Sequence, residues 1–145
     1  GIAKLPEGND YQLARKGAYI VAGSDTNPDV ILIASGSEVS TLESGAALLR
    51  KDGVKVRVVS APSEGLFRRQ PKEYQDMVLP YDVKKFGMTA GLPVTLEGLV
   101  GIGPNSRIFG MKSFGFSAPY KVLDEKLGYT GENVYKQVKA FLADA

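Results

Sequence analysis

The clearest pattern of apolar and polar positions lies in residues 29–40, which read DVILIASGSEVS. Residues 30–33 are continuously apolar and mostly β-branched, which suits a strand covered on both faces. After a short polar turn, apolar positions recur at helical spacing, at Val39, Leu42, Ala46 and Leu49. Either Ser37 or Ser40 could cap this helix, and Ser40 with Glu43 fits a capping box. The pattern therefore predicts a buried strand, a tight turn and an amphipathic helix.

This helix is expected to end near Gly53, which suits the left-handed position after a helix. The cations Arg50 and Lys51 would then lie in its last turn. Residues 54–60, VKVRVVS, alternate apolar and basic before becoming apolar, which predicts a second strand. Strand, helix and strand together form one βαβ unit, which should be right-handed.

A shorter strand is predicted at residues 18–21, ahead of a dense turn cluster at residues 23–28, GSDTNP. About half a dozen residues separate it from the strand at 29–34, whereas a parallel crossover needs about a dozen or more. We therefore expect these two strands to pair antiparallel if they are neighbours.

The remaining segments carry weaker patterns. Ser63 could cap a short helix at 64–69, and further elements are expected as helices at 71–77, 92–100, 119–127 and 132–143 and strands at 83–89 and 106–110. The last helix places Val134, Val138, Phe141 and Leu142 on one side. A chain of 145 residues with this alternation of strands and helices indicates one α/β domain.

The amino-acid composition excludes several kinds of site and partner. The chain has neither Cys nor His, so disulfides, thiolate metal sites and the commonest general base are excluded. A formal charge of +2, with the basic residues in scattered pairs, argues against nucleic acid as a partner. No apolar run approaches the roughly 20 residues that span a bilayer, and no signal peptide pattern opens the chain. Because it begins with Gly1, we expect a piece of a longer protein.

The turn after the first buried strand allows two interpretations. Ser35, Gly36, Ser37 and Ser40 could form an anion or regulatory site, since free N–H groups at a helix start favour negative charge. The alternative is a plain strand–helix turn with a capping serine. Glu38 already supplies negative charge in the first turn, which weakens the anion interpretation.

Three strings, taken in order, resemble one family. VILIASGSEV at 30–39, VKVRVVSAP at 54–62 and MKSFGFSAP at 111–119 are similar to the C-terminal domain of transketolase. YQDMVLP at 74–80 and LGYT at 127–130, followed by ENV at 132–134, add to the resemblance. It covers nearly all of the chain from about Gly17 onward.

The resemblance implies a three-layer α/β/α domain with a mostly parallel, five-stranded sheet whose first strand is antiparallel. It implies an enzyme of the pentose phosphate pathway that moves a two-carbon ketol unit from a ketose phosphate to an aldose phosphate. Such an enzyme holds thiamine diphosphate and a divalent metal, Mg or Ca, between its first two domains across a homodimer interface. Because the catalytic histidines and the activating glutamate belong to those domains, it implies no catalytic, cofactor-binding or metal-binding residue here.

The implied organisation is a linker from a preceding domain at residues 1–16 and a transketolase C-terminal-like domain at residues 17–145. The expected partners are the remaining transketolase domains and a second copy of the enzyme, with neither nucleic acid nor a membrane. The expected location is cytoplasmic. The domain itself would be non-catalytic, with a structural, dimer-supporting or regulatory role.

Two features depart from the family pattern. Thr89 stands where the family commonly has an acid before Ala-Gly, and residues 92–99 differ from its aromatic-rich stretch. An interdomain contact made by that acid would be in doubt here. The alternative function is a free-standing anion- or nucleotide-binding regulatory α/β module that uses the turns at Gly36 and Pro62.

Overall fold

The computed structural model describes residues 9–23, 27–110 and 128–144. Its sheet has the strand order β1-β3-β2-β4-β5. The strands are β1 (Tyr19–Ala22), β2 (Val30–Ala34), β3 (Val56–Ser60), β4 (Lys84–Met88) and β5 (Ser106–Phe109). β1 pairs antiparallel with β3, and the other pairings are parallel.

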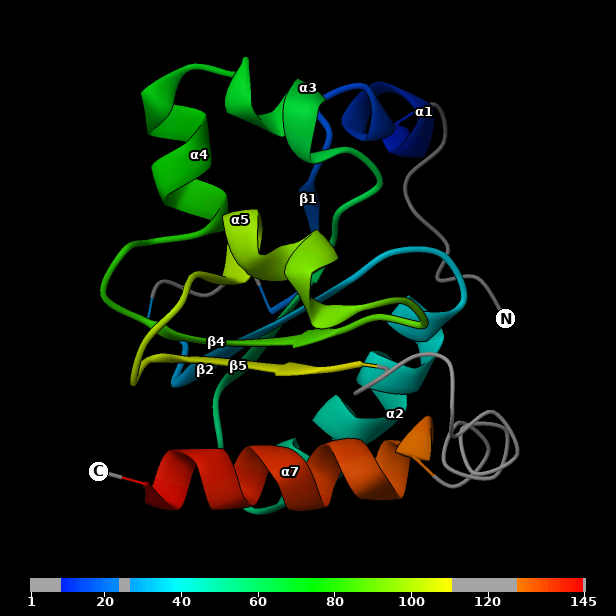
Figure 1. Ribbon diagram of the computed structural model, residues 1–145, viewed down its shortest axis with the longest axis vertical. Coiled ribbons are helices and arrows are strands. Elements are labelled where there is room, and N and C mark those ends of the chain that lie inside the picture. The colour runs from blue at the N-terminus through cyan, green and yellow to red at the C-terminus, as the bar shows by residue number, and fades with distance from the viewer. Residues whose placement is uncertain (1–8, 24–26, 111–127, 145) are drawn as a thin grey trace.

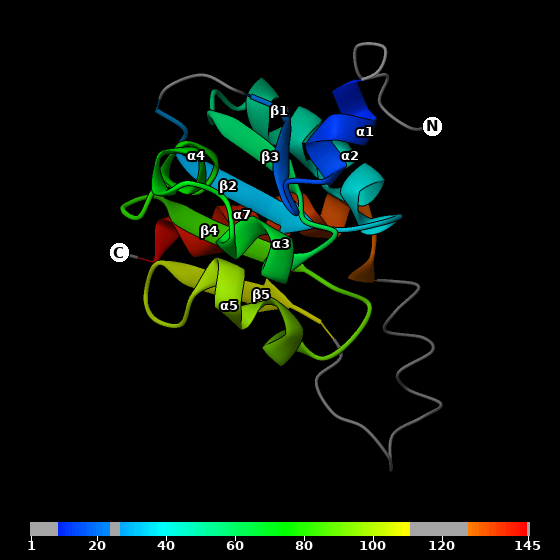
Figure 2. The same ribbon diagram turned by 90° about the horizontal axis from the view of Figure 1, so that it is seen from above.

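Helices cover both faces of this sheet (Figures 1 and 2). One face is covered by α2 (Glu38–Lys51) and α7 (Gly131–Ala143). The other face is covered by α3 (Glu64–Arg68), α4 (Lys72–Val78), the 3₁₀ turn η1 (Pro93–Leu96) and α5 (Glu97–Val100). A short helix, α1 (Asn9–Ala14), lies beside α3. The predicted three-layer α/β/α architecture is confirmed.

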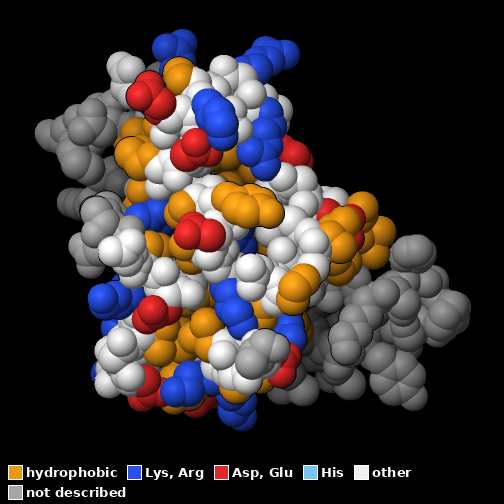
Figure 3. All heavy atoms as spheres, turned by 90° about the vertical axis from the view of Figure 1, so that its left-hand side faces the viewer, with side chains coloured by type: hydrophobic (Ala, Val, Ile, Leu, Met, Phe, Trp, Pro, Cys, Tyr) orange, Lys and Arg blue, Asp and Glu red, His pale blue; other side chains and the backbone are white. Residues whose placement is uncertain are grey.

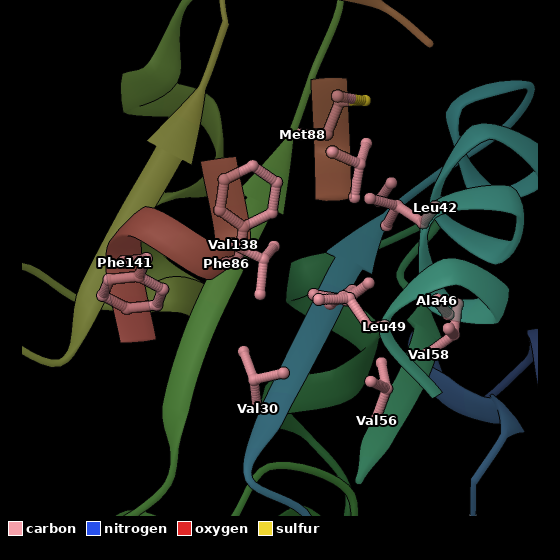
Figure 4. Close-up of a cluster of buried hydrophobic side chains, with 13 residues drawn as sticks. Val30, Leu42, Ala46, Leu49, Val56, Val58, Phe86, Met88, Val138 and Phe141 are labelled. Atoms are coloured by element: carbon pink, nitrogen blue, oxygen red, sulfur yellow. The ribbon is translucent and has the colours of Figure 1, made fainter. Parts of the chain in front are cut away.

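Strand β2 is buried on both faces, as its continuous apolar run predicts. Val30, Leu32 and Ala34 face α2 and α7, whereas Ile31 and Ile33 belong to the cluster on the opposite face. Figure 4 shows Val30 with Leu42 and Leu49 of α2 and with Phe86 of β4 in the first of these clusters. This central strand thus contributes to both hydrophobic cores.

The βαβ unit is confirmed, since β2 and β3 pair in parallel from Val30↔Val56 to Ala34↔Ser60 with α2 as the crossover. The first strand is antiparallel as predicted, but its neighbour is β3, with Tyr19 opposite Ser60. β1 cannot pair with β2, because β3 and β4 occupy both sides of that strand.

The N-terminus of α2 corrects one prediction. The helix begins at Glu38, with Ser37 in the N-cap position but making no side-chain capping hydrogen bond, and Ser40 lies inside the helix. The capping box of Ser40 with Glu43 is therefore wrong. Gly36, at φ +62°, turns the chain tightly enough to start the helix earlier than the apolar stripe suggests. The C-terminus agrees with the prediction, because Gly53 has φ +83° directly after the C-cap.

The helices discussed next agree with the sequence-based predictions, apart from one further correction. Ser63 caps α3, accepting a hydrogen bond from the Leu66 N–H at 3.2 Å as predicted. The helix expected at 92–100 is instead η1 followed by one turn of α5, because the backbone at Leu96, with ψ −3°, interrupts the helical geometry. The helix predicted at 119–127 and the SFGFSAP string lie outside the described residues.

Candidate functional site

The parallel strands end at one edge of the sheet, which we call the carboxyl edge. The chain runs from β2 to β3 on one side and later to β4 on the other, so the strand order reverses between β2 and β4. Ligands of open α/β sheets usually bind at such a reversal. The candidate site therefore lies between the turn that follows β2, at Ser35–Ser37, and the turn that follows β4, at Thr89–Gly91.

The turn after β2 is open to solvent. Ser35, Gly36, Ser37 and Ser40 are all exposed. The Ser37 hydroxyl donates to the Glu38 carboxylate at 3.2 Å, and the Val39 N–H donates to the Gly36 carbonyl at 3.2 Å. A carboxylate thus lies at the positive end of α2, where an anion would bind, and it repels such a ligand.

The turn after β4 is held by its own hydrogen bonds. The Thr89 hydroxyl oxygen accepts the Gly91 N–H at 3.0 Å, and the Thr89 carbonyl accepts the Tyr129 hydroxyl at 2.5 Å. The Tyr129 ring also packs edge-on against Phe109, with 5.2 Å between centroids. Thr89 therefore stabilises a local turn and brings no charge to the carboxyl edge.

The sequence pattern indicated the first turn but not the second as its neighbour. Tyr129 lies 40 positions beyond Thr89 in the sequence, and no local pattern links the two residues. The signal that could have identified the pair was topological. Once the strand order is known, the turns after β2 and β4 must face each other.

A hollow of about 540 Å³ lies at the opposite, amino edge of the sheet. Its lining includes Asp29, Asp82 and Lys84. The Lys84 amine is engaged, because it donates to the carbonyls of Phe141 at 3.0 Å and Asp144 at 2.8 Å at the end of α7. Figure 3 looks onto this edge, where hydrophobic, basic and acidic side chains are interspersed. The Asp29 carboxylate accepts the Lys55 N–H at 2.8 Å, so this charge too is bound to the backbone.

Among the residues that the structure describes, two cations are buried. The Lys85 amine donates to the carbonyls of Pro80 at 2.6 Å and Val83 at 3.0 Å, and burial lowers the pKa of this amine. Arg57 donates to the carbonyls of Gly23 at 3.1 Å and Met77 at 2.8 Å. Both side chains fix loops to the sheet, so their contacts indicate a structural role.

The described residues contain no group of three or more His, Cys, Asp or Glu that could hold a metal ion. Within the same residues, no helix has the length and apolar character needed to cross a bilayer.

Comparison with known proteins identifies the family. Residues 17–130 match the model of the transketolase-like TK C-terminal domain. The chain belongs to this family.

Curated transketolases give the same result. The chain is 38% identical to the transketolase of Staphylococcus aureus (strain MW2) over 138 residues, covering 94% of this chain and 20% of that protein. It is 44% identical to transketolase 1 of Vibrio parahaemolyticus over 129 residues, covering 88% of this chain and 19% of that protein. The chain thus spans about a fifth of the length of these relatives.

Solved transketolase structures share the fold. Transketolase from Leishmania mexicana superimposes with a TM-score of 0.75 at 33% identity, over 97% of this chain and 20% of that one. Transketolase from Pichia stipitis, in complex with sedoheptulose 7-phosphate, gives a TM-score of 0.76 at 27% identity, over 91% of this chain and 19% of that one.

The anion site at Ser35, Gly36, Ser37 and Ser40 stays a prediction, and phosphate titration followed by amide NMR shifts tests it. Because the Glu38 carboxylate opposes an anion, we expect larger shifts at residues 35–40 in Glu38→Gln than in the unmodified protein. Glu43→Gln, which removes a charge one turn further along α2, is the matched control. If millimolar phosphate shifts none of these amides in either variant, the serines serve only the turn.

Proposed function

We propose that this chain serves as the C-terminal domain of a transketolase. The whole enzyme would transfer a two-carbon ketol unit between ketose and aldose phosphates in the cytoplasmic pentose phosphate pathway. The family match supports this proposal, together with the alignment of this chain to one fifth of the transketolase of Staphylococcus aureus.

The chemistry of the side chains supports placing the reaction in other domains of the enzyme. Transketolases use thiamine diphosphate and a divalent metal, which require a diphosphate-binding metal site and an acid for the cofactor ring. The chain has no His and no Cys, and its described residues offer no set of metal ligands. These residues do not fit the cofactor, so we assign no step of the reaction to them.

Two observations together carry the proposal. The chain matches the family, and the hydroxyl groups at the carboxyl edge of its sheet form hydrogen bonds within their own turns. Thr89 and Ser37 both direct their hydroxyls to neighbouring groups of their own turns. In this proposal the domain supports the enzyme and its homodimer, or receives a regulator, and its partners are the other transketolase domains.

Domain replacement tests the proposal. We expect the transketolase of Staphylococcus aureus to lose ketol transfer when its matching segment is deleted, and to regain it when this chain replaces that segment. A replacement that carries Ser37→Ala should turn over as the unmodified replacement does. One that carries Phe86→Ala, in the hydrophobic core, should lose activity through unfolding.

The isolated domain provides the complementary measurement. We expect neither ketol transfer nor thiamine diphosphate binding by calorimetry. Turnover by the isolated domain would refute the proposal. A replacement enzyme that folds and dimerises but remains inactive would refute it as well. Nucleotide binding at residues 35–40 would instead favour the free-standing regulatory module.

A further inference from the structure

Asp52 and Gly53 form the only Asp-Gly pair of the sequence, which contains no Asn-Gly pair. In such a pair, glycine leaves its backbone nitrogen unshielded beside the aspartate carboxyl carbon, because it has no side chain. The nitrogen can attack that carbon, forming an N–Cγ bond, breaking a carboxyl C–O bond and releasing one water as a succinimide closes. Hydrolysis adds the water back. Cleavage of the new bond restores aspartate, and cleavage of the original peptide bond leaves isoaspartate.

The position of the pair in the fold gives water access. Asp52 is the C-cap of α2, and its side chain is 35% exposed. Gly53 has φ +83°, and a Cβ built on it would meet no atom within 4 Å. Gly53 is itself exposed, so the pair lies at the surface.

Hydrogen bonds nevertheless hold the reacting atoms apart. On α7, the Tyr135 hydroxyl and the Lys139 amine both donate to Oδ2 of Asp52, the amine at 3.1 Å. The Gly53 N–H donates to the Arg50 carbonyl at 3.0 Å. Ring closure requires rotation about the Cα–C and Cα–Cβ bonds of Asp52, so it must break these hydrogen bonds.

The two partners on α7 also select the less reactive form of the carboxyl group. The hydrogen bond from Tyr135, and then that from Lys139, lower the pKa of Asp52 below its ordinary value. An ionised carboxylate is a poorer target for the amide nitrogen than the neutral acid, because loss of water from it needs an additional proton.

We propose that Asp52-Gly53 is a site of spontaneous isoaspartate formation, held in check in the folded protein by Tyr135 and Lys139. Conversion inserts an extra carbon into the backbone after α2 and moves the carboxylate away from α7. The product has the chemistry that isoaspartyl carboxyl methyltransferases recognise. The contact between α2 and α7 thus determines the rate at which isoaspartate forms at Asp52.

The experiment measures isoaspartate at residue 52 during long incubation at neutral pH, by peptide mapping and by methyl transfer from an isoaspartyl methyltransferase. The test protein carries Tyr135→Phe with Lys139→Gln. The matched control carries Tyr81→Phe with Lys136→Gln, which makes the same atomic changes at a 95% exposed tyrosine and an exposed lysine. We expect about fivefold faster accumulation in the test protein than in the unmodified protein. The control should match the unmodified protein.

Two results would overturn the proposal. One is equal accumulation in the test protein, the control and the unmodified protein. The other is accumulation in the folded state as fast as in urea, where all three should react alike. Lys139→Arg keeps a cation at this position and should retain most of the protection. If the double variant fails to fold by circular dichroism, Tyr135→Phe and Lys139→Gln alone carry the same comparison.

Discussion

Replacing Gly45 by alanine is expected to destabilise the protein by about 2 kcal/mol, although the change would normally favour a helix. Gly45 lies on α2 where that helix crosses α7. A Cβ at this position would lie 2.5 Å from Cγ1 and 2.6 Å from Cβ of Val134, and 3.1 Å from the Gly131 carbonyl oxygen. Since Val134 is fully buried, its isopropyl group has no room to move aside without displacing α7.

Gly65 supplies the matched control. It also lies in a helix, α3, but a Cβ there meets only the Ser63 Oγ at 4.0 Å. Gly65→Ala should therefore stabilise the protein by about 0.5 kcal/mol. Urea unfolding at equilibrium measures both changes, and the opposite signs separate crowding from helix propensity.

A double-mutant cycle identifies the cause. Val134→Ala removes Cγ1, the nearest atom that the new Cβ would strike, but keeps Cβ, so the double variant should lose less stability than the sum of the two single losses. Additive losses would show that the contact with Val134 Cγ1 does not cause the effect of Gly45→Ala. Stabilisation by Gly45→Ala would show that α2 and α7 are not held this closely.

The parts of the fold that could be predicted from the sequence are those determined by local periodicity. The apolar run at 30–33 identified a strand buried on both faces, and the positive φ of Gly53 follows from its place after a helix. The start of α2 could not be predicted in this way, because several polar residues offered equivalent caps. The conformation of Gly36 decided between them.

Pairing between segments far apart in the sequence explains the other differences between the predicted and the observed structure. Loop length predicted an antiparallel pair between the first two strands if they were neighbours, but β3 lies between them, and β1 pairs antiparallel with β3 instead. The turn at Ser35–Ser37 was evident as a candidate site. The turn at Thr89–Gly91 was not, because its bond to the Tyr129 hydroxyl joins segments 40 residues apart. Topology, rather than composition, brings these two turns to one edge.

Arg57 is the clearest case in which periodicity alone does not reveal a buried charge. The alternating pattern VKVRVVS predicted the strand but not the burial of its cations: Arg57 is only 4% exposed, whereas Lys55 is exposed. The carbonyls that accept its hydrogen bonds include those of Gly23 and Met77, which lie 34 and 20 positions away. Burial of this cation depends on acceptors that only the folded protein assembles.

Arg57→Met is consequently expected to cost about 3 kcal/mol of unfolding free energy, because methionine fills the space but donates no hydrogen bond. The Gly23 carbonyl and the Met77 carbonyl near the end of α4 would lose their donor, and the negative end of that helix would lose its cation. Lys55→Met, an exposed change on the same segment, should stay within about 0.5 kcal/mol of the unmodified protein. Arg57→Lys keeps the charge but fewer donors and should lie between the two. Equal urea midpoints for Arg57→Met and Lys55→Met would show that the arginine contributes no net stability. In that case, hydrogen exchange at residues 77–79 would be as slow in Arg57→Met as in the unmodified protein.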